Sequence, residues 1–280
     1  MMPVEKEYMP SSVDEQMEAR IQSRAAPDSW SWKDQGGVSS IKDQVGNVFS
    51  IDKISVIELF HHQASCGSCA VFAAVATIDT CMWQVTGHLE DDLSEQHLMD
   101  CAYGWGYGNA GCDGGFVVSY MDWVVEGNNG YMEKESCAPY YASDMTCNDD
   151  DSCNYDQATV TGYYNNWSPD EDELKELVYI NPTATAIYAS YMFDYAGGIY
   201  DDSRCCEAVY DGSCDINHGV AVIGYGSEGG KDYWLIKNSW GTSWGENGFL
   251  RSAMRSRERF LLNEKYFQDE ERNRTLRSGD

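Results

Sequence analysis

The sequence has few basic residues and no long apolar run. Its 280 residues include 19 Lys and Arg against 46 Asp and Glu, which gives a formal net charge of −27. So acidic a chain repels nucleic acid and anionic membranes, and neither is expected as a partner. No apolar run approaches the roughly 18 residues that a membrane-spanning helix needs. A transmembrane helix is therefore not expected.

The N-terminus also lacks a visible leader. Met1-Met-Pro-Val-Glu-Lys6 does not combine a charged start with an apolar stretch, so no signal peptide is recognised. Residues 1–26 are polar throughout, and we expect them to be disordered. Ordered structure is expected to begin after them.

Cysteine, by contrast, is abundant. The chain has 11 cysteines, and aromatic residues make up 13% of it. This usage suits a secreted or lysosomal protein with disulfides better than a cytosolic one. A chain of 280 residues can bury one sizeable core or form two lobes.

The most informative motif is Cys66-Gly-Ser-Cys69, which runs directly into an apolar segment that predicts a buried helix. A thiol at a helix N-terminus is a strong nucleophile, because the unpaired N–H groups and the helix dipole favour the thiolate. Half a zinc site and a thioredoxin-like redox pair are the alternatives. No second Cys-x-x-Cys follows at the spacing of a zinc site, and the surroundings do not read as a βαβ unit. A structural disulfide at Cys66 is compatible with a nucleophilic Cys69.

Two downstream motifs supply the partners that such a thiol needs. His218, in Asn217-His218-Gly219, is a candidate base, and Asn238, in Asn238-Ser-Trp240-Gly241, is a candidate to orient it. No catalytic role is assigned to the remaining histidines. His88 and His97 are expected at exposed or helix-edge positions, and the pair His61-His62 is not expected to bind metal. The sequence therefore predicts no metal site and no cofactor.

The periodicity predicts helices in the first half of the chain and mainly short strands in the second. The expected helices cover residues 68–85, 94–100, 116–126 and 168–179. The expected strands cover residues 158–163, 183–188, 220–225 and 233–237.

Taken in order, these motifs resemble the papain-like cysteine proteases, and in particular their cathepsin L-like branch. The resemblance runs over residues 30–251 and includes Leu93-Ser-Glu-Gln96 and Gly111-Cys-Asp-Gly-Gly115. It implies an α+β fold of two lobes, a helical left lobe (27–135) and an antiparallel, barrel-like right lobe (136–251), with the cleft between them. It also implies an endopeptidase with a hydrophobic P2 preference, acting through a thiolate–imidazolium pair and an acyl-enzyme. Residues 1–26 would then be the remnant of a propeptide.

The resemblance assigns further site residues. Gln44 is the first choice for the side chain of the oxyanion hole and Gln63 the reserve, while Trp240 would shield the Asn238–His218 contact from water. A disulfide between Cys66 and Cys112 is implied; Cys101 would pair with Cys147 or Cys153, of which Cys153 fits better. Five residues are implied to contact substrate: Gly114, Gly115, Phe116, Asn217 and Trp240.

The resemblance also bears on partners and location. It implies protein or peptide substrates, cystatin-like inhibitors, a monomeric state and a lysosomal or extracellular location.

Two segments depart from the family pattern. Residues 45–63 separate Gln44 from the cysteine motif, and our hypothesis is that they are a translated intron; a genuine surface insertion is the alternative. Residues 252–280 replace the expected C-terminal element, as a shifted reading frame would. If both segments are real, a second function stays open, namely a catalytically impaired papain-fold protein that binds peptides or partners.

Overall fold

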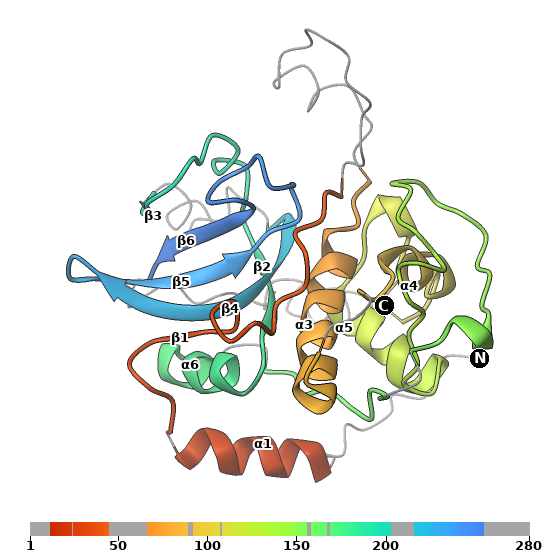
Figure 1. The fold of residues 1–280 in the computed structure, drawn as a ribbon, viewed down its shortest axis with the longest axis horizontal. Helices are drawn as coiled ribbons and strands as arrows, with labels where there is room; N and C mark the ends of the chain where they lie inside the picture. Colours follow the sequence, from red (N-terminus) through yellow and green to blue (C-terminus); the bar gives the residue numbers. More distant parts are fainter. Residues whose placement is uncertain are drawn as a thin grey trace, which may run out of the picture.

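The computed structural model describes residues 12–23, 25–44, 66–88, 92–106, 108–155, 158–166, 169–202 and 216–254. Within them the chain forms an α+β structure of two lobes (Figure 1). A twisted sheet with helix α6 (Glu171–Ile180) makes one lobe. Helices α3 (Cys69–Thr86), α4 (Glu95–Cys101) and α5 (Val117–Asp122) make the other. This arrangement confirms the predicted fold class.

The sheet is built around its longest strand, β4. Its order is β1-β4-β5-β6-β3, and β2 also pairs with β4; every pair is antiparallel except β3 with β6. The nine residues from His218 to Gly226 in β4 are buried, which explains the apolar run that predicted a strand there. The strands are β1 (Trp30–Ser31), β2 (Thr183–Ile187), β3 (Ile199–Tyr200), β4 (His218–Glu228), β5 (Lys231–Lys237) and β6 (Phe249–Ala253).

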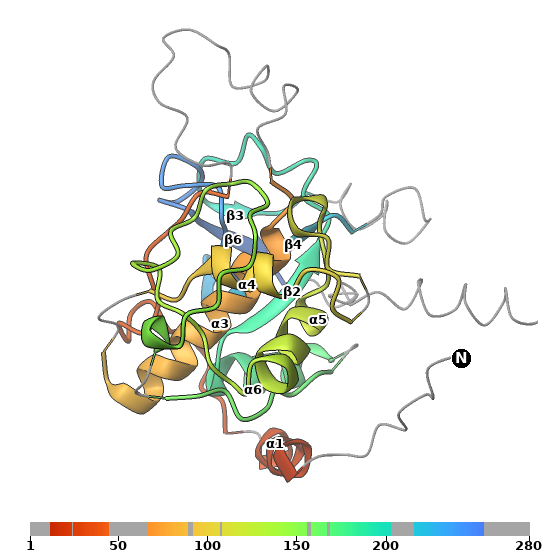
Figure 2. The same cartoon turned by 90° about the vertical axis from the view of Figure 1, so that its right-hand side faces the viewer.

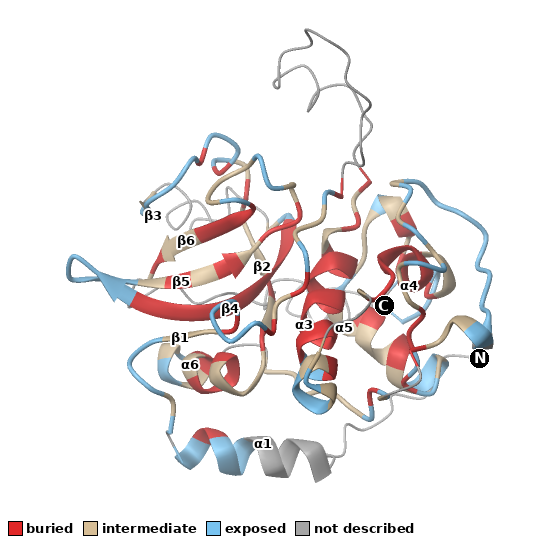
Figure 3. Ribbon diagram, in the orientation of Figure 1, coloured by how far each residue is buried: buried red, intermediate tan, exposed pale blue. Residues whose placement is uncertain are grey.

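Helix α3 runs between the lobes (Figures 1 and 2). Every residue from Ala70 to Thr80 is buried, as the red colouring along the helix in Figure 3 shows. The helix ends where Gly87, at φ 75°, donates its N–H to the carbonyl of Trp83. By length and hydropathy it is the one helix among the described residues that could cross a membrane, but most of it is buried within the protein. Its burial on all sides marks it as the core helix of a two-lobed protein.

The hydrophobic cores of the two lobes do not divide the chain at residue 135. Tyr155 and Val160 lie in the core of the helical lobe with α3 and α4, although the sequence placed them in the β-rich lobe. Conversely, Trp30 belongs to strand β1 and pairs with Tyr225 in the sheet. Each lobe therefore contains a segment from the other half of the sequence, and these segments connect the two lobes.

Three local predictions need correction. Residues 158–163 form no strand, because Val160 pairs with the carbonyl of Gly130 in a loop rather than with a neighbouring strand. Helix α6 begins at Glu171, three residues after the start predicted for it, since Asp170 caps it in a reciprocal box with Glu173. Residues 12–23, expected to be disordered, form helix α1 (Ser12–Ser23) below α6 (Figure 1).

Candidate active site

Cys69 is the first residue of α3, as its sequence predicts. Its thiol is free and only partly exposed. The preceding turn is fixed by the disulfide between Cys66 and Cys112 and by a 2.7 Å hydrogen bond from the Gly67 N–H to the Cys112 carbonyl. A side chain at Gly67 would meet that carbonyl at 2.7 Å, so the close approach requires glycine here. The thiol is therefore held rigidly at the helix N-terminus.

His218 opens strand β4 and is buried. Its Nε2 lies 2.7 Å from Asn238 Oδ1, and the same Oδ1 accepts the N–H of Ser239 at 2.8 Å. A main-chain N–H can only donate, so this atom of Asn238 is the oxygen and His218 Nε2 carries the proton. The other ring nitrogen, Nδ1, is thus free to take a proton from a nucleophile.

The start of β4 lies directly against the start of α3. A Cβ built on Gly219 would come within 3.1 Å of main-chain atoms of both Cys69 and Ala70, so only glycine fits between the strand and the helix. The structure thereby brings together the cysteine and histidine motifs, which are separated by almost 150 residues of sequence.

Burial shifts both titrating groups toward their neutral forms. It raises the pKa of the Cys69 thiol, opposed by the main-chain N–H groups of Gly219, Ala70 and Cys69 itself. It lowers the pKa of His218 to about 4, opposed by the hydrogen bond to Asn238. These N–H groups are aimed at the sulfur and stabilise negative charge there.

Gln44 lies at the seam of the two lobes and is buried. Its Nε2 donates to the carbonyl of Cys66 at 3.2 Å, and its Oε1 accepts from Ser239 Oγ at 2.6 Å. The amide therefore sits beside the turn that carries Cys69, as an oxyanion donor would. Gln63, the reserve candidate, lies outside the described residues.

Trp240 covers the histidine. Its ring centroid is 4.7 Å from that of His218, and the ring of Phe193 stacks on it at 5.0 Å. Trp244 contacts Trp240 edge-on at 5.0 Å. These aromatic rings restrict the access of water to the His218–Asn238 pair, in keeping with the role predicted for Trp240.

The glycine pair expected to contact substrate lies close to the cysteine turn. The Gly114 N lies 3.4 Å from the position that a Cβ of Gly67 would take, and Phe116, which follows the pair, is 40% exposed. Asn217 makes a main-chain contact instead. Its Oδ1 accepts the N–H of Ala189 at 2.9 Å, which fixes the loop before His218.

A buried ion network beside the site was missed by the sequence analysis. Lys42 pairs with Glu95 and, at 3.2 Å, with Glu135. Burial opposes the charge of Lys42, but the two carboxylates outweigh it and raise the lysine's pKa. A cavity adjoins this network where the lobes meet; it is lined by Lys42, Phe72, Ala73, Ala76, Glu95, Gly219, Val220, Lys237, Asn238 and Ser239. No pattern in the sequence marked Lys42 as buried.

One disulfide prediction was wrong. Cys101 is bonded to Cys147, not to Cys153, which is bonded to Cys137. The Met145 N–H bonds to the Asp100 carboxylate at the end of α4, which places Cys147 beside Cys101. The Lys134 N–H bonds to the Cys153 carbonyl, which places Cys153 beside Cys137. Cys205, Cys206 and Cys214 lie outside the described residues.

His97 was also misplaced. It was expected at an exposed or helix-edge position, yet it is 3% exposed. Helix α4 is only seven residues long and is buried along its first five, so it has no solvent-facing edge there. The short length of the helix predicted at residues 94–100 was the one sign of this burial in the sequence.

A thiol, an imidazole and an amide are the groups that thiol-dependent hydrolases combine in one site. Comparison with known proteins agrees. Residues 49–268 match the sequence profile described as "Papain family cysteine protease". The chain belongs to the papain family of cysteine proteases.

Known relatives place the chain within the family. It is 35% identical to cathepsin S of Mus musculus and 38% identical to digestive cysteine proteinase 1 of Homarus americanus, over 82% of this chain in each case. It covers 60% and 63% of those two proteins. The chain thus spans less than two thirds of the length of these curated relatives.

Solved structures show the same fold. Bromelain from Ananas comosus, in complex with the inhibitor E64, superposes with a TM-score of 0.64 at 30% identity, covering 84% of this chain and 92% of that one. Digestive procathepsin L 3 of Tenebrio molitor superposes with a TM-score of 0.68 at 30% identity, covering 91% and 79%.

Proposed function

We propose that the protein is a cysteine endopeptidase in which Cys69 is the nucleophile and His218 the general base and acid. The observation that supports the proposal is the close approach of Gly219, the residue after His218, to the main chain of Cys69 and Ala70 at the N-terminus of α3. Transfer of the thiol proton to His218 Nδ1 creates opposite charges side by side. Their attraction offsets the burial that disfavours each charge alone.

The bond-making steps follow from these positions. The thiolate of Cys69 attacks the substrate carbonyl, and the resulting oxyanion is held by the Cys69 N–H and the Gln44 amide. The imidazolium of His218 then gives its proton to the departing amine, leaving a thioester. Water, deprotonated by the same nitrogen, hydrolyses the thioester and restores the thiol. Asn238 keeps the ring in place by accepting its Nε2–H throughout.

We further propose a hydrophobic P2 preference. Phe116 presents an exposed ring on one lobe, and Ala186, paired with Gly219 in the sheet, presents a small apolar side chain on the other. A P2 side chain lying between them would bury apolar surface. A substrate with a charged P2 residue would have to desolvate that charge there.

The test is hydrolysis of a series of peptide amides that differ only at P2. Leu or Phe at P2 should give a kcat/KM at least about tenfold above Arg or Glu, the ratio expected for burying one apolar side chain. Equal rates across the series would overturn the P2 assignment, while the absence of turnover with intact binding would identify the catalytically impaired alternative.

The three disulfides of the described residues indicate an oxidising compartment. We infer a lysosomal or extracellular location, with protein or peptide substrates and, by analogy with the family, cystatin-like inhibitors. The protein is proposed to act as a monomer because each lobe contributes to one complete site.

A further inference from the structure

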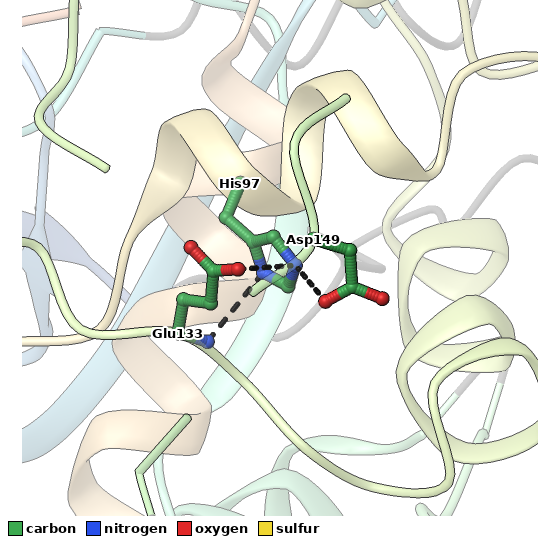
Figure 4. Close-up of side chains that lie close together, drawn as sticks. All are labelled: His97, Glu133 and Asp149. Atoms are coloured by element: carbon green, nitrogen blue, oxygen red, sulfur yellow. Dashed lines mark hydrogen bonds and ion pairs between the residues drawn. The ribbon is translucent and has the colours of Figure 1, made fainter. Parts of the chain in front are cut away.

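A second cluster of chemically active side chains lies in the helical lobe, apart from the residues of the proposed catalytic site. His97 comes from α4, Glu133 from the segment that bridges to Asn154, and Asp149 from an acidic loop. Figure 4 shows the two carboxylates converging on the same edge of the imidazole. One ligand atom from each side chain lies within 4.8 Å of the other two.

The distances in this cluster are those of ligands around an ion. His97 Nε2 lies 3.4 Å from Asp149 Oδ1 and 3.7 Å from Glu133 Oε1. Both are longer than the usual N–H···O hydrogen bond of about 2.7–3.2 Å. Two ligands of a tetrahedral zinc ion, each bonded at about 2.0 Å, are separated by about 3.3 Å, which these pairs approach.

Burial makes His97 Nε2 exceptional. The side chain of His97 is 0% exposed, that of Glu133 is 2% exposed, and Nε2 makes no hydrogen bond. Buried polar atoms without a hydrogen bond are rare in native proteins and call for a ligand or another explanation. Asp149 is 45% exposed, which gives an ion a way in from solvent.

The surroundings fix two of the three side chains. The Asp150 N–H donates to Glu133 Oε1 at 2.7 Å, and the ring of Trp123 lies edge-on to the imidazole at 5.4 Å. Two disulfides bracket the cluster: His97 lies four residues before Cys101, and Asp149 lies in the loop between Cys147 and Cys153. The imidazole of His97 and the carboxylate of Glu133 are thus held in place by contacts within the protein.

We propose that His97, Glu133 and Asp149 bind a zinc ion, with water completing the coordination. An imidazole ligand selects Zn²⁺ and its transition-metal neighbours over Ca²⁺ and Mg²⁺, and the two carboxylates neutralise its charge. The ion joins the acidic loop to α4 and so acts as a structural cross-link. The sequence analysis had predicted no metal site.

One contact limits the affinity. Nδ1 of His97 lies 3.5 Å from the main-chain N of Glu133. When Nε2 binds an ion, the ring proton sits on Nδ1 and faces that N–H donor. Affinity is therefore expected to be below that of zinc fingers and to fall as pH falls, because zinc and a proton compete for Nε2.

The experiment is a calorimetric titration of metal-stripped full-length protein with ZnCl₂. Cys69→Ala and Cys81→Ser remove the two free thiols of the described residues in every sample. The test variant is Asp149→Asn. The matched control is Asp150→Asn, which makes the same charge change in the same loop and keeps an oxygen for the Ser152 N–H that Asp150 accepts.

The parent should bind one zinc ion at this site, and Asp149→Asn should weaken that binding by at least about tenfold, since even outer contacts of metal sites are worth 10–100-fold. Asp150→Asn should stay within about twofold. Zinc should also raise the Tm of the parent and of Asp150→Asn but not of Asp149→Asn. Co²⁺ should give the visible absorption of a tetrahedral site in the parent and in Asp150→Asn, but not in Asp149→Asn. Equal zinc binding by the two variants, or no saturable binding by the parent, would overturn the proposal.

Discussion

Gln44 and Ser239 join the two lobes directly above the cysteine turn. Ser239 Oγ donates to Gln44 Oε1 at 2.6 Å, and the Gln44 N–H donates to the Ser239 carbonyl at 2.9 Å. With its oxygen held in this way, the amide can direct only its Nε2 toward the turn that carries Cys69. The relationship favours Gln44 over Gln63 as the oxyanion donor.

Gln44→Ala should therefore lower kcat by about 10²–10³-fold with little change in KM, because the lost hydrogen bond forms mainly in the transition state. Steady-state kinetics on a peptide amide checks this, and Gln63→Ala is the matched control. If Gln63→Ala proves the more damaging change, the assignment must be reversed.

Removal of residues 45–63 should leave an active enzyme. Gln44 Nε2 donates to the Cys66 carbonyl, so the described residues on either side of the segment lie close together. The shortened chain would join Gln44 directly to Ala64. Loop entropy alone penalises a long insertion by only about 0.6 kcal/mol per doubling of its length, so stability should change little or rise. The deletion variant should match the parent in kcat/KM and in its melting temperature. A folded but inactive deletion variant would show that the segment contributes to the site.

Lys42→Met should destabilise the protein strongly. The substitution leaves Glu95 buried without its ion pair, a change that costs about 3–5 kcal/mol in comparable cases. Lys231→Met is the control, because the Lys231–Asp201 pair is exposed and is worth at most about 1 kcal/mol. Urea unfolding should separate the two variants by at least about 2 kcal/mol. Equal midpoints would mean that water reaches Lys42 freely.

The protonation of His218 should be visible in stability. Burial lowers its pKa from 6.5 to about 4, so the folded state resists binding a proton that the unfolded state takes up below pH 6.5. In a Cys69→Ala background, where no thiolate can form, His218 then costs up to about 3 kcal/mol of stability as pH falls from 6.5 to 4. Comparison with Cys69→Ala/His218→Gln by chemical unfolding isolates this cost. If the two proteins differed in free energy of unfolding by the same amount at pH 7 and at pH 4, this prediction would be contradicted.

The sequence was most informative where chemistry needs a fixed residue type. Cys69 at a helix start, His218 at a strand start and the Asn238 motif could be predicted, and the structure confirms the helix and the strand that carry them. The disulfide partner of Cys101 could not be predicted, since Cys137, Cys147 and Cys153 lie close together in sequence and a hydrogen bond to the end of α4 decides between them.

The burial of His97 and Lys42 was equally hidden. Both depend on contacts between segments that lie 36 to 93 residues apart, and periodicity describes only one segment at a time. Helix α1 was missed for a similar reason. Its polar composition gave no sign of order, which it gains beside α6 from the far half of the chain.

The central claim is that Cys69 is a nucleophile activated by His218. The most direct measurement is intact-mass analysis after treatment with an epoxide that alkylates catalytic thiolates, on the parent, Cys69→Ala and His218→Ala. The account predicts one adduct on the parent, mapped to Cys69, none on Cys69→Ala, and labelling slowed by at least about 10²-fold on His218→Ala. An unlabelled parent, or equal labelling of Cys69 with and without His218, would contradict it.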